Sequence, residues 1–206
     1  MTRARCLLCD FGNVIAFFDH TKAARRLARM AQPPLDPQEA FDGVFRTPLE
    51  DDYDSGRIST PAFIARLRSL LRLDGTDIEI ARAWNDIYTP NNAMASVLAD
   101  LKRRGVRLVL ASNTNELHYE WFRPLFARTL DLFDHEVLSF RVGCRKPDAR
   151  FFEACLRGAL DVPPQECLYV DDRPDLIEAA HTMGITGVVY APGVEETISG
   201  LLIPDS

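Results

Sequence analysis

The sequence predicts an α/β fold, a doubly wound, Rossmann-like parallel sheet with a helical-bundle cap inserted into it. Short apolar runs that stop abruptly at polar residues alternate with amphipathic helical patterns along most of the chain. Continuous apolar runs are typical of parallel strands that are covered on both faces. From residue 19 to residue 90 the sequence has helical patterns but no such run. We therefore expect a core formed by residues 1–18 and 91–206 and a cap formed by residues 19–90.

The expected strands of the core share this buried pattern, and each ends at or next to polar residues. In chain order they are "RCLLCD" (5–10), "RLVLASN" (107–113), "HEVLS" (135–139), "CLYVDD" (167–172) and "TGVVYA" (186–191).

The expected helices show apolar residues at helical spacing and end at Gly or other breaking residues. In the core they cover 92–105, 148–160 and 175–185, and in the cap 21–31, 37–45, 60–73 and 77–88. The acidic stretch "LEDDYDSG" (49–56) is interpreted as a solvated part of the cap.

Composition limits the classes of function. The chain has 206 residues, 47% of them hydrophobic and 26% charged, which is ordinary for a globular protein. The net charge of −6 argues against a nucleic-acid partner, because phosphate backbones are bound by clustered Lys and Arg. The sequence contains no apolar run of 18 residues, so we expect no membrane segment.

The five cysteines are scattered and odd in number, so a disulfide framework is not expected. Cys6 and Cys9 form a C-x-x-C pair, but on a strand positions i and i+3 point to opposite faces. Two thiols aimed apart cannot share a metal ion, and both are expected to be buried strand residues. A reducing, cytoplasmic location fits this usage.

Polar residues at the ends of successive strands form the candidate site. In open parallel sheets, ligands bind beyond the carboxyl ends of the strands. The residues at these ends are Asp10, Ser112, Asn113, Asp171 and Asp172, with Lys146 following the strand at 135–139. Carboxylates, a hydroxyl, an amide and a lysine together suit phosphoryl transfer through an aspartyl intermediate.

A carboxylate that attacks a phosphate dianion needs positive charge nearby, since the like-charge repulsion is about 4 kcal/mol per pair at 4 Å. Mg²⁺ held by carboxylates supplies part of it, and Lys146 the rest. Ser112 and backbone N–H groups hold the phosphoryl oxygens. Asp10 then serves as nucleophile and metal ligand, and Gly12 lets its own carbonyl reach the metal.

Four segments resemble, in order, the four motifs of the haloacid dehalogenase-like (HAD) superfamily of hydrolases. They are "CDFGNVI" (9–15), "LVLASNTN" (108–115), "CRKPDARFFE" (144–153) and "YVDDRPDLIEAA" (169–180). The helical insertion after the first motif resembles a C1-type cap. The D-x-G-N-V form of that motif is most similar to the sugar-phosphate phosphatase branch, that of the α-glucose-1-phosphate phosphatases.

The resemblance implies a role for each matching residue. Asp10 would be the nucleophile, Ser112 the phosphoryl anchor with Asn113 beside it, and Lys146 would neutralise the intermediate. Asp172 would bind Mg²⁺ directly, together with Asp10 and the carbonyl of Gly12, and Asp171 directly or through water. Asp175 would support these ligands from behind. Gly12 and Asn13 would complete the phosphate-binding residues with Ser112, Asn113 and Lys146.

One departure from the family pattern concerns the acid–base group. The second Asp of the usual D-x-D motif protonates the leaving group, and here that position is Gly12. Asp19, His20 or another cap residue are the candidates to replace it. Otherwise the four histidines (His20, His118, His135 and His181) have no ligand spacing and are interpreted as structural or surface residues. The aromatic run at 118–126 is interpreted as packed core or a subunit contact.

The predicted function is a Mg²⁺-dependent phosphatase acting on a small phosphorylated metabolite, with a sugar phosphate as the favoured class. A catalytically silent relative that senses a phosphate ligand or serves as an interaction module is the alternative, because Gly12 replaces the acid. A 2-haloacid dehalogenase ranks lower, since it would leave Asp171 and Asp172 unexplained. The sequence does not decide whether the protein forms a homodimer.

Overall fold

Five parallel strands form the central sheet, in the order β5-β4-β1-β6-β7. The structure is a computed structural model and describes residues 4–202. The strands are β1 (Cys6–Cys9), β4 (Arg107–Ser112), β5 (His135–Leu138), β6 (Cys167–Asp171) and β7 (Thr186–Val189). Each lies within a segment expected to be a strand, so the predicted doubly wound α/β fold is confirmed.

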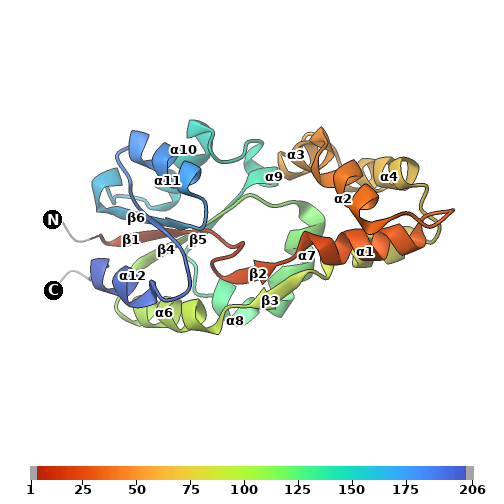
Figure 1. Cartoon of the computed structure of the whole chain (residues 1–206). Coiled ribbons are helices and arrows are strands. Elements are labelled where there is room, and N and C mark those ends of the chain that lie inside the picture. Colours follow the sequence, from red (N-terminus) through yellow and green to blue (C-terminus); the bar gives the residue numbers. More distant parts are fainter. Residues whose placement is uncertain (1–3, 203–206) are drawn as a thin grey trace.

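Helices cover both faces of this sheet (Figure 1). On one face lie α6 (Asn92–Arg103) and α12 (Glu195–Leu201). On the other, α10 (Ala149–Gly158) packs on β4 and β5, and α11 (Pro174–Thr182) packs on β6 and β7. The remaining core elements are α7 (Glu116–Leu125), α8 (Ala127–Leu130), α9 (Ser139–Val142) and the 3₁₀ turn η1 (Pro164–Glu166). The two layers explain why the strands are apolar on both sides.

Cys6 and Cys9 lie in different layers of the core, Cys6 with the α10 and α11 side chains and Cys9 with those of α6. All five cysteines are buried and free. The prediction that the C-x-x-C pair is a pair of strand residues aimed apart is confirmed.

Five helices follow β1 and lie at the far end of the molecule from the chain ends (Figure 1). They are α1 (His20–Met30), α2 (Pro37–Phe45), α3 (Pro48–Asp54), α4 (Thr60–Leu71) and α5 (Asp77–Asn85). They pack around a hydrophobic cluster of their own, whose largest fully buried side chains are Trp84, Tyr53 and Phe63. We retain the division into core and a cap at 19–90 as a proposal that this separate cluster supports.

Two short strands join the cap helices to the core. β2 (Ala16–Phe18) and β3 (Tyr88–Pro90) pair antiparallel. No strand was expected here, because each has three residues and most of these are partly exposed, so neither forms an apolar run.

Helix α3 corrects the interpretation of 49–56 as a solvated stretch. Thr47 caps its N-terminus and Pro48 occupies its first turn. Because residues four apart share one helix face, Glu50 and Asp54 point the same way, and both line a pocket. Asp54 is only 6% exposed.

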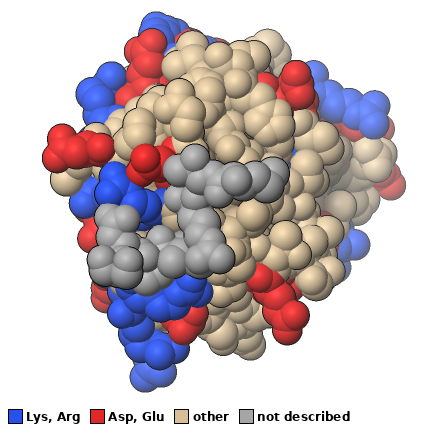
Figure 2. All heavy atoms as spheres, turned by 90° about the vertical axis from the view of Figure 1, so that its left-hand side faces the viewer, with Lys and Arg blue, Asp and Glu red and all other residues tan. Residues whose placement is uncertain are grey.

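The end of the molecule opposite the cap carries the amino ends of the strands. Figure 2 shows acidic and basic side chains interspersed around the margin of this face, with uncharged residues toward its middle. The pocket described next lies at the other end of the sheet. Among the described residues, none of the helices is long and apolar enough to span a bilayer.

Candidate active site

The register of the sheet brings the carboxyl ends of three strands to the same level. Cys9 pairs with Leu110 of β4 and with Val170 of β6. The next residue of each chain segment is therefore Asp10, Ala111 or Asp171, side by side at the carboxyl edge. Sequence reasoning expected this meeting of strand ends, and the register produces it.

Lys146 is buried between these strand ends. Its ammonium Nζ donates to Asp10 Oδ1 at 2.8 Å, to Asp171 Oδ2 at 2.7 Å and to the Ala111 carbonyl at 2.8 Å. An ammonium has three N–H donors, so each one has an acceptor. The lysine is 4% exposed, and its charge is balanced by two carboxylates.

Asn113 holds the loop that carries Lys146. Its side-chain amide donates to the Lys146 carbonyl at 3.1 Å and accepts from the Lys146 N–H at 2.9 Å. The amide is therefore engaged with backbone, although it also borders the pocket. Ser112 is 2% exposed, and its hydroxyl makes one long contact, 3.5 Å, to the Asn113 carbonyl.

The two aspartates after β6 are held differently. Asp171 accepts from Lys146, from the Tyr169 hydroxyl and from the Arg173 N–H at 2.9 Å, so both of its oxygens are engaged. Asp172 accepts from Asn13 Nδ2 at 2.9 Å. Asn13 has a left-handed backbone, φ 55°, which Asn tolerates better than most residues. Asn13 thus orients Asp172.

Asp10, Asp171 and Asp172 each offer a carboxylate oxygen, and these atoms lie within 4.8 Å of one another. Hard oxygen ligands of this kind suit Mg²⁺. Burial raises the pKa of Asp10 to about 7, against the opposing effect of Lys146, and burial also raises the pKa of Asp172. Three carboxylates around one lysine leave negative charge that a divalent cation would offset.

Asp175 does not join this cluster. It lies in the first turn of α11, where its exposed carboxylate pairs with Arg173 at 2.5 Å. Gly12 lies in the pocket wall beside Asp10.

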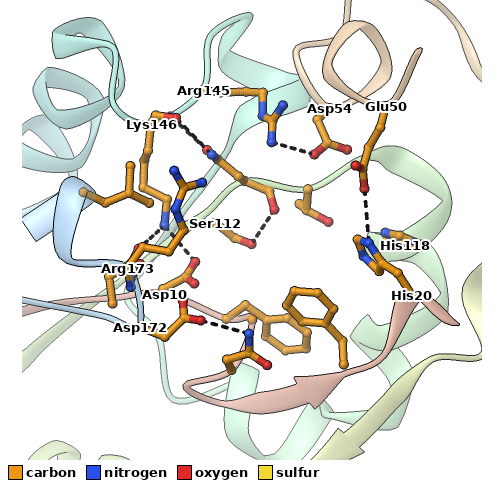
Figure 3. A pocket seen from close by; sticks show the side chains of 18 of the residues that line it. Asp10, His20, Glu50, Asp54, Ser112, His118, Arg145, Lys146, Asp172 and Arg173 are labelled. Carbon is orange, nitrogen blue, oxygen red and sulfur yellow. Dashed lines mark hydrogen bonds and ion pairs between the residues drawn. The ribbon is translucent and has the colours of Figure 1, made fainter. Parts of the chain in front are cut away.

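The cluster lines one end of a pocket of about 260 Å³, and cap residues line the other end (Figure 3). Asp54 of α3 accepts from Asn115 Nδ2 at 2.9 Å and lies 3.5 Å from the guanidinium of Arg145. Glu50, one turn earlier on α3, lies 3.8 Å from His20 Nδ1. Burial raises the pKa of Asp54 to about 7 and of Glu50 to about 8, and lowers the pKa of His20 to about 4.

Comparisons with known proteins agree with this geometry. The sequence model of the haloacid dehalogenase-like hydrolases matches residues 5–184. The chain belongs to this family.

Two curated relatives are named as phosphatases. A sesquiterpene phosphatase of Aspergillus oryzae is 30% identical over 147 residues, 67% of this chain and 70% of that protein. A phosphatase of Mycobacterium tuberculosis is 27% identical over 185 residues, 85% of this chain and 82% of that protein.

Solved structures share the fold. A predicted HAD-like hydrolase of Porphyromonas gingivalis superposes with a TM-score of 0.82 at 23% identity, covering 97% of this chain and 98% of that chain. A HAD family enzyme of Bacteroides thetaiotaomicron, in complex with magnesium and inorganic phosphate, has a TM-score of 0.78 at 24% identity, covering 92% of this chain and 96% of that chain.

In this HAD-like hydrolase an aromatic ring fills the space beside Gly12. A Cβ placed on Gly12 would lie 2.7 Å from Cε1 of Phe18 in β2. A side chain at position 12 therefore requires the Phe18 ring to move. This chain therefore lacks both the aspartate that the family pattern has at this position and the space that its side chain would need.

Of the expected replacements for that acid, His20 lines the pocket and Asp19 does not. Asp19 instead caps helix α1, where it accepts from the Thr21 N–H. His118, interpreted as a structural or surface residue, is buried in the pocket wall, and burial lowers its pKa to about 3. From the same aromatic run, Phe122 is buried and stacks on Phe11 at 3.8 Å between ring centroids.

Sequence reasoning did not select Glu50, Asp54 or Arg145 as site residues. The spacing of the two acids, four residues apart after a Thr-Pro helix start, was a signal that could have placed them on one helix face. Arg145 directly precedes Lys146 within the third motif. Its partners, Asp51 and Asp54, lie on the cap, so the motif alone does not indicate them.

Proposed function

We propose that this hydrolase is a Mg²⁺-dependent phosphatase that acts on a small phosphorylated metabolite through an aspartyl-phosphate intermediate on Asp10. The observation that carries the proposal is the buried Asp10, hydrogen-bonded to Lys146 and grouped with Asp171 and Asp172 at the floor of a pocket. The phosphatase names of two relatives support it.

In the first step a carboxylate oxygen of Asp10 forms a bond to phosphorus while the bond from phosphorus to the leaving oxygen breaks, and that oxygen takes a proton from water and leaves as an alcohol. In the second step water attacks phosphorus, which releases phosphate and restores the Asp10 carboxylate. Lys146 is fixed beside Asp10 before the reaction, so its charge faces the phosphoryl group without rearrangement. The Ser112 hydroxyl lines the same wall and can donate to a phosphoryl oxygen.

Asp10 and Asp172 are the residues that would hold Mg²⁺ directly, with the Gly12 carbonyl beside them. Asp171 already accepts hydrogen bonds on both oxygens, which favours contact through water. When bound, the ion would offset charge on the phosphoryl oxygens.

For the substrate class we favour a sugar phosphate. No aspartate stands at position 12 to protonate the leaving group, and an anomeric phosphate's sugar departs with less help than a simple alcohol. The pocket of about 260 Å³ suits a compact ligand.

The test is phosphate release from p-nitrophenyl phosphate, α-glucose 1-phosphate, other sugar phosphates and a prenyl phosphate, with and without Mg²⁺. We expect Mg²⁺-dependent release by the wild type and a loss of at least about 10³-fold in Asp10→Asn, which removes the nucleophile. Asp161→Asn, a matched change at an exposed residue after α10, serves as control.

A second function, a silent phosphate sensor, is favoured by one observation, the Phe18 ring in place of the acid. Binding of Mg²⁺ and phosphate by a folded protein that hydrolyses none of the panel would support the sensor and refute the phosphatase. Release of halide from 2-haloacids without Mg²⁺ would instead indicate a dehalogenase.

We also propose that the protein works in a reducing compartment such as the cytoplasm, which its five free, buried cysteines support. A homodimer stays a prediction, to be tested by light scattering.

A further inference from the structure

Glu50 is a carboxyl group without a hydrogen-bond partner among residues 4–202. It lines the pocket on the side opposite Asp10 (Figure 3). Its nearest charged or titratable partner is His20 Nδ1 at 3.8 Å, beyond hydrogen-bonding distance. Burial lowers the pKa of His20 to about 4, so this imidazole is neutral at pH 7 and gives Glu50 no cationic partner. The Glu50 side chain is 19% exposed, so its carboxyl group is mostly withdrawn from water but open to a ligand that fills the pocket.

The positive charge nearby belongs to other carboxylates. Arg145 contacts Asp51, and it lies 3.5 Å from Asp54, so two acids already share its guanidinium. Glu50 adds a third carboxyl to this wall. Burial and then the neighbouring Asp54 raise the pKa of Glu50, and Arg145 lowers it by less. The cap end of the pocket thus has more carboxyl groups than cations.

The other groups of this wall suit a cation as well. Phe18 lines this pocket with its ring 4.8 Å from the His20 ring, and the faces of aromatic rings attract cations. Thr114 borders the same pocket, is 4% exposed, and its hydroxyl has no partner within the described chain. It offers a second acceptor to a group that carries several N–H donors.

We infer that the substrate's leaving group carries a protonated amine that binds Glu50 at the cap end of the pocket, while the phosphate binds beside Asp10. The inference rests on the proposed phosphatase function and narrows its substrate to an amine-bearing phosphate, such as an amino sugar phosphate. The ammonium donates to the Glu50 carboxylate, and a proton held by the carboxyl group of the empty pocket leaves to solvent. Arg145 contacts Asp51 and Asp54 and makes no ion pair with Glu50 among the described residues, although its charge lowers the pKa of Glu50.

The experiment compares ligands that differ only by amine against hydroxyl: glucosamine 6-phosphate with glucose 6-phosphate, and phosphoethanolamine with glycol phosphate. Calorimetry measures their binding to Asp10→Asn, which does not turn them over, and to Asp10→Asn with Glu50→Gln. Turnover of the same pairs is measured in the wild type and in Glu50→Gln, with p-nitrophenyl phosphate as the general phosphatase substrate. Glu39→Gln, a matched change at an exposed cap residue, is the control.

We expect the amine of each pair to bind at least about tenfold more tightly than its hydroxyl analogue, which corresponds to about 1.4 kcal/mol. Glu50→Gln should remove this preference by raising KM for the amine substrates, with little change in kcat. Glu39→Gln should keep the preference. Equal binding of amine and hydroxyl ligands, or an amine preference that survives Glu50→Gln, would overturn the inference. Turnover of p-nitrophenyl phosphate in the same experiment would still support the phosphatase function. If no compound is hydrolysed, the phosphatase proposal fails, and calorimetry still decides whether Glu50 selects amines.

Discussion

The two ends of the pocket are built in opposite ways. At the core end Lys146 has an acceptor for every N–H, and Asp171 accepts on both oxygens. At the cap end Glu50 has no hydrogen bond within the described chain, and the nearby cation is shared by other acids. The core end is assembled by the fold before any ligand arrives, whereas the cap end is completed only by a ligand. We infer that the core end carries out the chemistry that the family shares and that the cap end selects the leaving group.

Removal of Lys146 should disrupt the core end and lower both stability and turnover strongly. Lys146→Met leaves Asp10 and Asp171 buried without their cation, so the free energy of unfolding should fall by about 3–5 kcal/mol. Turnover should fall at least about 10³-fold as well, because the charge facing the phosphoryl group is lost. Urea unfolding at pH 7.5 and initial rates measure the two effects.

The matched control is Lys102→Met. Lys102 pairs with Asp134 at 2.6 Å on the surface, where a salt bridge contributes about 0–1 kcal/mol. Similar losses of stability in both variants would mean that the buried lysine is no more important than a surface one, and the contrast between the two ends would fail.

Most of the core end could be predicted from the sequence, and the cap end could not. Buried parallel strands leave continuous apolar runs, and the polar residues that follow them must meet at one edge of the sheet, as Asp10 and Asp171 do. The hydrogen bonds of Asn113 to the Lys146 backbone leave no such pattern, since they depend on how two loops meet. Glu50 lies in an acidic stretch that resembles a solvated surface, and only tertiary packing of α3 against the core turns it inward.

Gly12 and Phe18 lie where the two ends of the pocket meet, and an acid restored at position 12 should act there only if the ring makes room. Gly12→Asp alone should not raise turnover, because its Cβ would lie 2.7 Å from the Phe18 ring. Combined with Phe18→Ala, which makes room, it should raise turnover of alkyl phosphates about 10²-fold over Phe18→Ala alone, the usual contribution of a general acid. Turnover of p-nitrophenyl phosphate, whose leaving group needs little protonation, should change much less.

Initial rates of all four proteins with both substrate types measure this effect. An equal gain in Gly12→Asp with Phe18 intact would show that the ring does not block the position. No gain in the double variant would show that the leaving oxygen lies out of reach of residue 12.

The smallest predicted effect is a dependence of stability on pH that arises at the cap end. Burial raises the pKa of Glu50 from an ordinary 4.5 to about 8. The folded state therefore binds this proton more tightly than the unfolded chain does. The stabilising contribution is complete below about pH 4.5 and is lost as the pH rises toward 8. Glu50→Gln, which cannot ionise, should escape this loss.

Urea unfolding at several pH values between 4 and 8.5 measures the prediction. Glu50→Gln should match the wild type near pH 4 and exceed it by roughly 1–3 kcal/mol at pH 8.5. The titratable or charged groups that face Glu50 from other segments are His20, Tyr88, His118 and Arg145. His20 and His118 have pKa values lowered from 6.5 to about 4 and about 3, so their effect on stability changes below about pH 6.5 and is common to both proteins.

Glu39→Gln, exposed on α2, should show no such divergence. If Glu50→Gln instead lowers stability at pH 8.5, the Glu50 carboxylate is compensated within the folded protein. The cap end would then be as complete as the core end, and an amine in the leaving group would lose its physical reason.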